Sequence, residues 1–161
     1  LRPPDWWLRA GGAVVVIPNF FVDDFDPNPV MTCTPASRSI FPIGTTTVQC
    51  RAVDASGNVS DWVLFQVMVA DTIDPTIAID APAKGAHALN STEIVSFSCA
   101  DTGSGIKTCK ASLTTPNGRT QPIVNGAPLL FATVGQYSLT VKAVDAAGLK
   151  ATKTINMRVT R

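Results

Sequence analysis

The sequence predicts an all-β chain that folds as two tandem β-sandwich domains, and three observations support this. First, an Asp-x-x-Gly motif occurs at residues 54–57 and again at residues 145–148, each time between two strand-like runs. A hairpin repeated at domain length is typical of an array of similar domains. Second, Val and Thr are frequent, and Glu93 is the only glutamate. Third, the 12 prolines and 11 glycines are spread along the chain, as expected between short strands.

The chain length is sufficient for two small domains, since it has 161 residues. We expect a first domain over residues 1–70, a linker over residues 71–75 and a second domain over residues 76–161. The linker, Asp-Thr-Ile-Asp-Pro, is too short to let the domains tumble freely. Each domain has only a small core, so covalent or metal staples are expected to add to its stability.

In the first domain, the residue pattern predicts four strands. They cover residues 13–21, residues 30–34, a longer run from Gly44, and a last run that ends near Ala70. Successive side chains of a strand point to opposite faces, so each of the last two runs has an inward set. These sets are Thr46, Val48, Cys50 and Ala52, followed by Phe65, Val67 and Val69.

In the second domain, residues 94–100 and 106–113 are expected to form a hairpin closed by a turn over residues 101–105. The dipeptides Asn117-Gly118 and Asn125-Gly126 are turn signals that separate short segments around residues 120–124 and 128–131. The last two strands share an inward set of Tyr137, Leu139, Val141, Ala143, Ile155, Met157 and Val159. Several short strands with regular turns indicate all-β sandwiches.

The four cysteines allow three pairings, and local spacing favours Cys33 with Cys50 and Cys99 with Cys109. The first bond would join a middle strand to the penultimate strand, whereas the second would close the expected hairpin. Such bonds imply an oxidising compartment. The alternative is four buried, unpaired thiols. A cysteine metal site is disfavoured, because the sequence has no CxxC pair and His87 is its only histidine.

Residues 30–35 (Val-Met-Thr-Cys-Thr-Pro) and 41–58 (Phe-Pro-Ile-Gly-Thr-Thr-Thr-Val-Gln-Cys-Arg-Ala-Val-Asp-Ala-Ser-Gly-Asn) carry a family pattern. This pattern resembles the hyalin repeat, an immunoglobulin-like module of extracellular proteins, over about residues 11–70. The second half, mainly through residues 135–148, is similar to bacterial immunoglobulin-like domains found in tandem on secreted and surface proteins. The resemblance implies adhesion, spacing or scaffold roles without known catalysis, and an extracellular or cell-surface location in a bacterium.

Two groups of oxygen-bearing side chains are candidate calcium ligands, because loops at one end of such a sandwich converge. The first group lies around the linker and consists of Asp71, Asp74, Asp101 and Asp145. The second lies in the first domain and consists of Asp23, Asp24, Asp26, Asp54 and Asn58. Calcium takes six to eight oxygen ligands, and at the linker it would stiffen the joint. The alternative is that each Asp caps its own turn. No cofactor is required by the sequence.

Several function classes are disfavoured by the composition. The formal net charge is +1 and basic residues are scattered, so no footprint for nucleic acid is visible. No apolar run is long enough for membrane insertion. His87 lies in a Gly-Ala-His-Ala segment without a nucleophile motif such as GxSxG, so we expect a surface histidine. The chain is therefore not expected to be an enzyme.

Three functions remain. The leading hypothesis is a non-enzymatic extracellular module that serves as a stalk, an adhesin segment or a subunit of a surface assembly, with other protein domains or subunits as partners. The second is a carbohydrate-binding accessory region of a secreted hydrolase, in which Trp6 and Trp7 contact glycans. The third is a filament subunit. Residues 2–9 do not look like the family's opening strand, so the first domain is truncated, lacks that strand or receives one from a neighbour.

Overall fold

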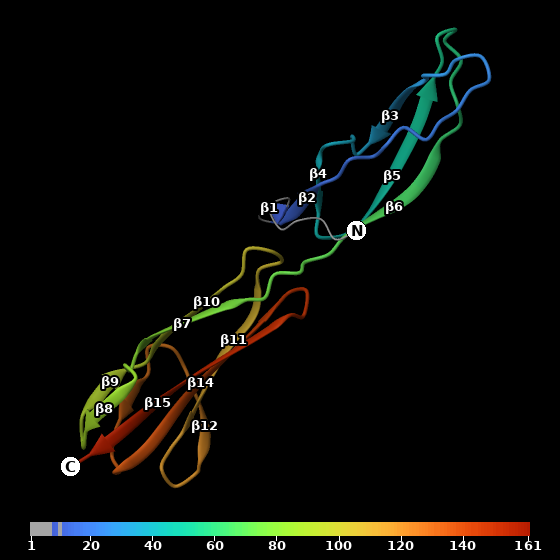
Figure 1. The fold of residues 1–161 in the computed structure, drawn as a ribbon. Helices are drawn as coiled ribbons and strands as arrows, with labels where there is room; N and C mark the ends of the chain where they lie inside the picture. Colours follow the sequence, from blue (N-terminus) through green and yellow to red (C-terminus); the bar gives the residue numbers. More distant parts are fainter. Residues whose placement is uncertain (1–7, 10) are drawn as a thin grey trace. The chain divides into compact units, whose positions relative to one another are not determined.

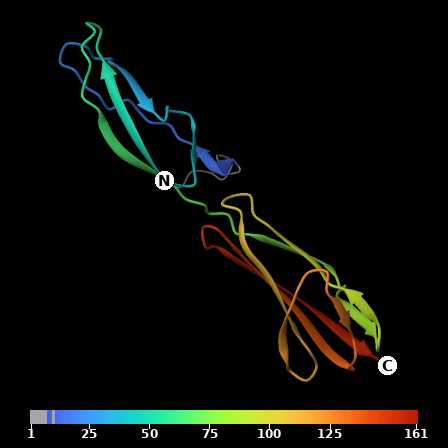
Figure 2. The same cartoon turned by 180° about the vertical axis from the view of Figure 1, so that it is seen from behind.

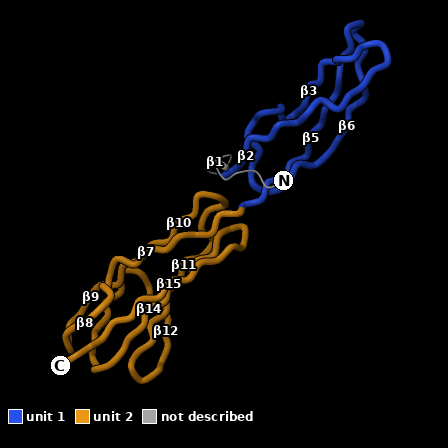
Figure 3. Tube along the Cα trace, in the orientation of Figure 1, with its two compact units in different colours: residues 1–71 blue, residues 72–161 orange. Residues whose placement is uncertain are grey.

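The computed structural model describes residues 8–9 and 11–161, and this part of the chain contains strands and turns but no helix. The expected fold class, all-β with immunoglobulin-like sandwiches, is confirmed. The chain divides into two compact units, Leu1–Asp71 and Thr72–Arg161 (Figure 3). The interaction expected for Trp6 and Trp7 lies outside the described residues.

Unit 1 consists of two three-stranded sheets (Figure 1). One has the order β1-β2-β4, with β1 Leu8–Arg9, β2 Gly12–Val14 and β4 Ile40–Pro42. The other has the order β3-β5-β6, with β3 Val30–Thr34, β5 Gly44–Val53 and β6 Val63–Val69. All pairings are antiparallel, and β5 is the central strand of its sheet.

The core of unit 1 forms where β5 faces the segment around β4. Phe41, Val48 and Cys50 are fully buried there. The expected inward set of β5 is confirmed, because Val48, Cys50 and Ala52 are all buried while Gln49 and Arg51 are exposed. The burial of one apolar side chain of this size contributes roughly 1.5–3 kcal/mol, so these few residues make up much of a small core.

The strand expected over residues 13–21 is wrong beyond Val14. Pro18 has no N–H to donate to a ladder, and the neighbouring amides bond to side chains or loops. The amide of Ile17 donates to Ser37 Oγ at 2.9 Å, and that of Phe21 donates to the Asn19 side chain at 3.1 Å. This segment still contributes Ile17 to the core, although it is not a regular strand.

Unit 2 contains one five-stranded sheet of order β12-β11-β14-β15-β8 and two ladders, β10-β7 and β13-β9. The long strands β14 and β15 run side by side in both views (Figures 1 and 2) and pair from Gly135↔Val159 to Val144↔Lys150. The strands of unit 2 are β7 Thr76–Ala81, β8 Gly85–Ala88, β9 Thr92–Ile94, β10 Ser96–Ala100, β11 Ile106–Thr114, β12 Thr120–Ile123, β13 Pro128–Leu130, β14 Gly135–Asp145 and β15 Lys150–Thr160.

The core of unit 2 follows the alternation of its long strands. On β14 the expected inward set is confirmed, because Tyr137, Leu139, Val141 and Ala143 are all buried. Met157 and Val159 of β15 are equally buried, and Ile155 packs against the same cluster. Phe131 fills the space opposite and contacts the Tyr137 ring edge-on, with a centroid separation of 5.3 Å.

The two expected disulfides are confirmed, but the expected hairpin is wrong. Cys33 and Cys50 are directly opposite each other on β3 and β5. Cys99 and Cys109 are bonded across a Cα–Cα distance of 6.0 Å, yet their strands do not pair. Instead, β10 pairs with β7, whereas β11 pairs with β12 and β14. The turn over residues 101–105 therefore carries the chain from one sheet to the other, and the bond joins the two sheets.

His87 is buried rather than on the surface as expected. It lies on β8, opposite Val159 of the parallel-paired β15. Its Nδ1 is 2.7 Å from Glu93 Oε1, its Nε2 is 2.9 Å from the carbonyl oxygen of Ala83, and its ring stacks on Phe131. Both ring nitrogens therefore have a partner inside unit 2, which favours a structural role for this histidine.

Both disulfides are expected to stabilise the units by restricting the unfolded chain. The bonds close segments with sequence separations of 17 and 10 residues, and each should contribute about 3 kcal/mol. Replacing Cys99 and Cys109 together with alanine should lower the denaturant midpoint of unit 2. The same double replacement of Cys33 and Cys50 should act on unit 1. Equal midpoints for a double variant and the parent protein would contradict the expectation.

Candidate metal centre

The repeated Asp-x-x-Gly motif forms the same turn in both units. In unit 1 the Asp54 amide donates to the Asn58 carbonyl oxygen, and the Gly57 amide donates to that of Asp54. In unit 2 the Asp145 amide donates to Leu149, and the Gly148 amide donates to Asp145. Both glycines have positive φ, 88° and 95°, a conformation that glycine adopts without steric cost. The repeat seen in the sequence is therefore a repeat of backbone geometry.

The two turns differ in how the aspartate side chain is satisfied. In unit 1, Asp54 Oδ1 accepts from the amides of Ser56 and Asn58, and Oδ2 accepts from Asn58 Nδ2 at 2.6 Å. In unit 2, Asp145 Oδ1 accepts from the Leu149 amide at 2.8 Å. The apolar Leu149 stands where unit 1 has Asn58, so it has no side-chain donor. Asp145 Oδ2 is buried without a hydrogen-bond partner.

A second buried carboxylate oxygen without a partner belongs to Asp101, at the end of β10. Asp101 Oδ2 accepts from the amides of Gly103 and Gly105, at 3.1 and 2.7 Å, which shapes the loop over residues 101–105. Asp101 Oδ1 is buried and makes no hydrogen bond. Two hydrogen bonds connect this loop to the Asp145 turn. The Ala146 amide donates to the Gly105 carbonyl oxygen, and the Ala147 amide donates to Ser104 Oγ.

Three carboxylates come together at this place. Asp71, Asp101 and Asp145 each bring one oxygen within 4.8 Å of the oxygens of the other two. Asp145 is fully buried, and Asp71 has an exposed fraction of 8%. Asp71 is the last residue before Thr72, where unit 2 begins. Of the four residues expected around the linker, Asp74 is not in this group and is exposed to solvent.

This arrangement has the chemistry of a hard-cation site. Burying carboxylates close together, with Asp101 Oδ1 and Asp145 Oδ2 lacking a donor, is unfavourable, and a divalent cation would compensate their charge. The donor set consists of oxygen alone, which suits calcium or magnesium better than zinc. Three carboxylates provide three to six oxygen ligands, and backbone carbonyl groups or water can complete the coordination of calcium.

In the second expected cluster, in unit 1, Asp23, Asp26 and Asp54 accept hydrogen bonds from backbone amides of their own turns. Asp23 Oδ1 accepts from the amides of Phe25 and Asp26, and the carboxylate of Asp26 accepts from the amides of Asn28 and Ala55. Asp24 is exposed, and Asp71, Asp101 and Asp145 form the only group of candidate metal ligands found among the described residues. For Asp23, Asp26 and Asp54, the hydrogen bonds thus match the alternative in which an Asp caps its turn.

The residue after Gly148 decides how the carboxylate of Asp145 is satisfied. Leu149 offers no oxygen ligand, whereas unit 1 has Asn58 at the same place of the repeat. In the structure, Leu149 also lacks the donor that would occupy Asp145 Oδ2, in contrast to Asn58, which donates to Asp54. Aligning the two repeats shows the difference between Asn58 and Leu149. The effect of this difference on Asp145 becomes clear only from the contact between the Asn58 side-chain amide and the Asp54 carboxylate.

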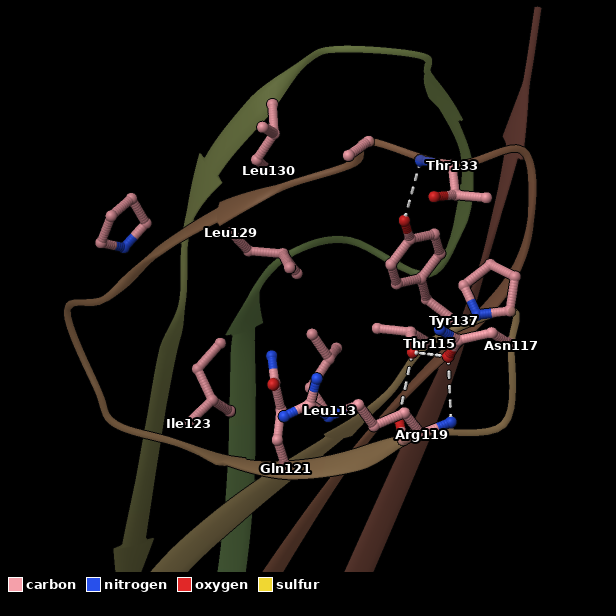
Figure 4. Close-up of a pocket in the computed structure, with 13 residues that line it drawn as sticks. Leu113, Thr115, Asn117, Arg119, Gln121, Ile123, Leu129, Leu130, Thr133 and Tyr137 are labelled. Carbon is pink, nitrogen blue, oxygen red and sulfur yellow. Dashed lines mark hydrogen bonds between the residues drawn. The ribbon is translucent and has the colours of Figure 1, made fainter.

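A separate pocket of about 420 Å³ lies in unit 2 next to the turn over residues 115–119 (Figure 4). Its lining combines apolar side chains with amide, guanidinium and hydroxyl groups. It is lined by Leu113, Thr115, Pro116, Asn117, Arg119, Gln121, Ile123, Pro128, Leu129, Leu130, Ala132, Thr133 and Tyr137. Tyr137 accepts a hydrogen bond from the Thr133 amide at 3.1 Å, so its hydroxyl is held in place.

Within the described residues, no helix is long and apolar enough to cross a membrane.

No protein-family model matches the chain, and no curated protein does. Among solved structures, the chain is similar to fibronectin(III)-like modules of CbhA from Clostridium thermocellum. The identity is 16%, with 74% of this chain and 64% of that chain covered and a TM-score of 0.43. It is also similar to Protocadherin Gamma B2 extracellular cadherin domains 1-5 (16% identity, 78% and 28% covered, TM-score 0.38) and 3-6 (16%, 77% and 35%, 0.36). The chain spans less than two thirds of each of these chains. At this similarity, they identify no family and no function.

Replacing Leu149 with asparagine should stabilise unit 2 when divalent cations are absent. The new amide would donate to Asp145 Oδ2, as Asn58 does in unit 1, and satisfying a buried charged acceptor is worth about 1–3 kcal/mol. Chemical denaturation in a chelator measures the change. Leu149→Ala is the control, since it removes the same side chain without adding a donor. A Leu149→Asn variant no more stable than Leu149→Ala would contradict the geometric comparison.

The Asp54 turn should depend on pH in a defined direction. The Asn58 side-chain amide, then the backbone amides of the turn, lower the pKa of Asp54 below its ordinary 3.8. Its contribution to stability is therefore fully present above pH 3.8 and is lost as the pH falls through the lower folded-state pKa. An NMR titration of the carboxyl carbon measures this pKa. Asn58→Ala should move it up towards 3.8; an unchanged value would contradict the assignment of the main cause.

Proposed function

We propose that the chain is a non-enzymatic extracellular structural or adhesion module, with a hyalin-repeat-like first unit and a bacterial immunoglobulin-like second unit. Each small unit contains a disulfide, which suits an oxidising, extracellular environment. The histidine is occupied by Glu93 and Ala83 rather than presented to a substrate. These observations support a role as a stalk, adhesin segment or surface-assembly subunit, with other proteins as partners.

The module further uses a divalent cation, best supported as calcium, at Asp71, Asp101 and Asp145. The observation that carries this proposal is the fully buried Asp145 carboxylate, with one oxygen that has no hydrogen-bond partner. Asp101 offers a second such oxygen, and Asp71 completes the group. The role of the cation is structural. It offsets the buried charge and fixes the two loops that end β10 and β14.

Because Asp71 belongs to the segment that joins the two units, the cation would also restrict this segment. Such a cation would stiffen a tandem array because one of its ligands, Asp71, lies in the short connection. The proposal predicts that backbone amides over residues 71–75 become more protected from hydrogen exchange when calcium is added. This effect is separate from the stability of unit 2 itself.

Calcium should raise the melting temperature of the chain, because a ligand that binds only the folded state stabilises it by mass action. At a calcium concentration of 100 times Kd, the gain is about 2.7 kcal/mol. Calorimetry with calcium and with a chelator measures it. Asp145→Asn should abolish the shift and stabilise the chelated protein, since it removes a buried charge. Asp74→Asn, outside the group, should keep the shift. An identical melting temperature in both buffers would rule out the site.

A second candidate function is glycan binding by unit 2, favoured by the pocket of about 420 Å³. A lining of apolar side chains with a few amide and guanidinium groups is a common arrangement in small-molecule sites. Binding on a glycan array that is lost in Arg119→Ala would favour this function over the structural one. Binding lost only on changing Trp6 and Trp7 to alanine would place the glycan contact in the N-terminal segment instead. If the parent protein binds no glycan, the glycan-binding function is excluded and the structural function remains.

A further inference from the structure

The final strands of the two units have different neighbours. In unit 2, β15 pairs with β14 on one side, and on the other side the parallel strand β8 covers its edge. In unit 1, β6 pairs with β5 in the equivalent register, since Gly44↔Val69 corresponds to Gly135↔Val159. Among the described strands, none pairs with the other edge of β6. Within the described residues, unit 1 therefore has an unpaired sheet edge at the place where unit 2 has a paired one.

The open edge has none of the usual protection against pairing. The sequence of β6 is Val-Leu-Phe-Gln-Val-Met-Val, seven residues without charge, proline or glycine. Exposed edge strands in monomers normally carry lysine, proline or a bulge, because unpaired N–H and C=O groups recruit other strands. Here, Leu64 and Met68 have exposed fractions of 64% and 77% and lie on the outer face of this edge. Exposure of this size on an uncharged edge indicates a contact surface.

The residue pattern of β6 is symmetric about Gln66. Counting outward in both directions, Phe65 corresponds to Val67, Leu64 to Met68, and Val63 to Val69. An antiparallel pairing of two copies centred on Gln66 would place Leu64 of one copy opposite Met68 of the other, twice, on the outer face. On the inner face it would place Phe65 opposite Val67. Apolar cross-strand pairs of this kind stabilise a ladder, and no like charges oppose each other.

We propose that a second copy of this chain pairs with β6, antiparallel and with a two-fold axis at Gln66. The pairing joins the two three-stranded β3-β5-β6 sheets into one continuous sheet. The same patch serves both copies, as in an isologous interface. This assembly is closed, because each copy uses its open β6 edge. It is thus distinct from a filament built by passing a strand from neighbour to neighbour.

The size of the interface sets its expected strength. Each copy contributes the seven residues of β6 and their neighbours, well below the roughly 20–30 residues a side of a standard interface. The dimer is therefore expected to be weak and transient. High local concentration on a surface favours such a dimer, because a shared support raises the effective concentration. The inference stands apart from the cation site, which lies outside β6.

Sedimentation velocity of the full chain, in a chelator to exclude any cation effect, tests the proposal. The parent protein should change from monomer to dimer with rising concentration and should not grow further. Gln66→Lys places two like charges opposite each other at the axis and should raise the dimer Kd about fivefold or more. Thr34→Lys is the matched control, because it adds the same charge at the opposite, β3 edge of the same sheet and should leave the Kd unchanged.

The register is tested by mixing two variants. Gln66→Lys and Gln66→Glu should each dimerise poorly alone, whereas an equimolar mixture should recover dimers, because the opposite charges then meet at the axis. Circular dichroism and melting confirm that both variants fold, as expected for exposed positions. A parent protein that stays monomeric up to about 1 mM, or larger open-ended assemblies, would overturn the proposal. Equal weakening by Thr34→Lys, or a mixture that does not recover dimers, would also overturn it.

Discussion

The register of the longest ladder in this protein depends on one short turn with an aspartate at its head. Asp145 closes the connection between β14 and β15, and the buried side chains of both strands follow from that register. A slip of one residue would exchange the core and solvent faces of β15. The side chain that holds this turn is itself fully buried. In unit 2, the residue that closes the β14–β15 turn therefore also carries a buried carboxylate oxygen without a hydrogen-bond partner.

The two units can be compared with each other, because they contain the same turn with different hydrogen bonds to the aspartate side chain. Unit 1 satisfies its exposed aspartate entirely with hydrogen bonds from within the turn. Unit 2 buries its aspartate and replaces the amide donor with leucine, so that one oxygen faces no donor. A similar contrast holds at the sheet edges, where β15 is covered by β8 while the outer edge of β6 is unpaired among the described strands. The two units thus share a backbone arrangement but differ in which polar groups have hydrogen-bond partners, both at the turn and at the sheet edge.

Strong alternation made the central strands predictable from the sequence, whereas tertiary pairing did not follow from it. The inward sets of β5 and β14 were correct, since period-two burial is a local property of the residues. The turn over residues 101–105 was misassigned because a turn of that length can close a hairpin or carry the chain between sheets. His87 was misplaced because its burial depends on the parallel pairing of β8 with β15. The convergence of Asp101 with Asp145 followed from loop topology, but the unpartnered oxygens required atomic positions.

The inter-sheet disulfide of unit 2 also links the redox state of the chain to the position of one carboxylate. Cys99 and Cys109 enclose the loop that positions Asp101, so this bond restrains the loop before any ligand is present. Without the bond, the loop would be held by its hydrogen bonds to Asp101 and by the two bonds from the Asp145 turn. Reduction would therefore loosen the approach of Asp101 to Asp145 without changing a residue of either turn.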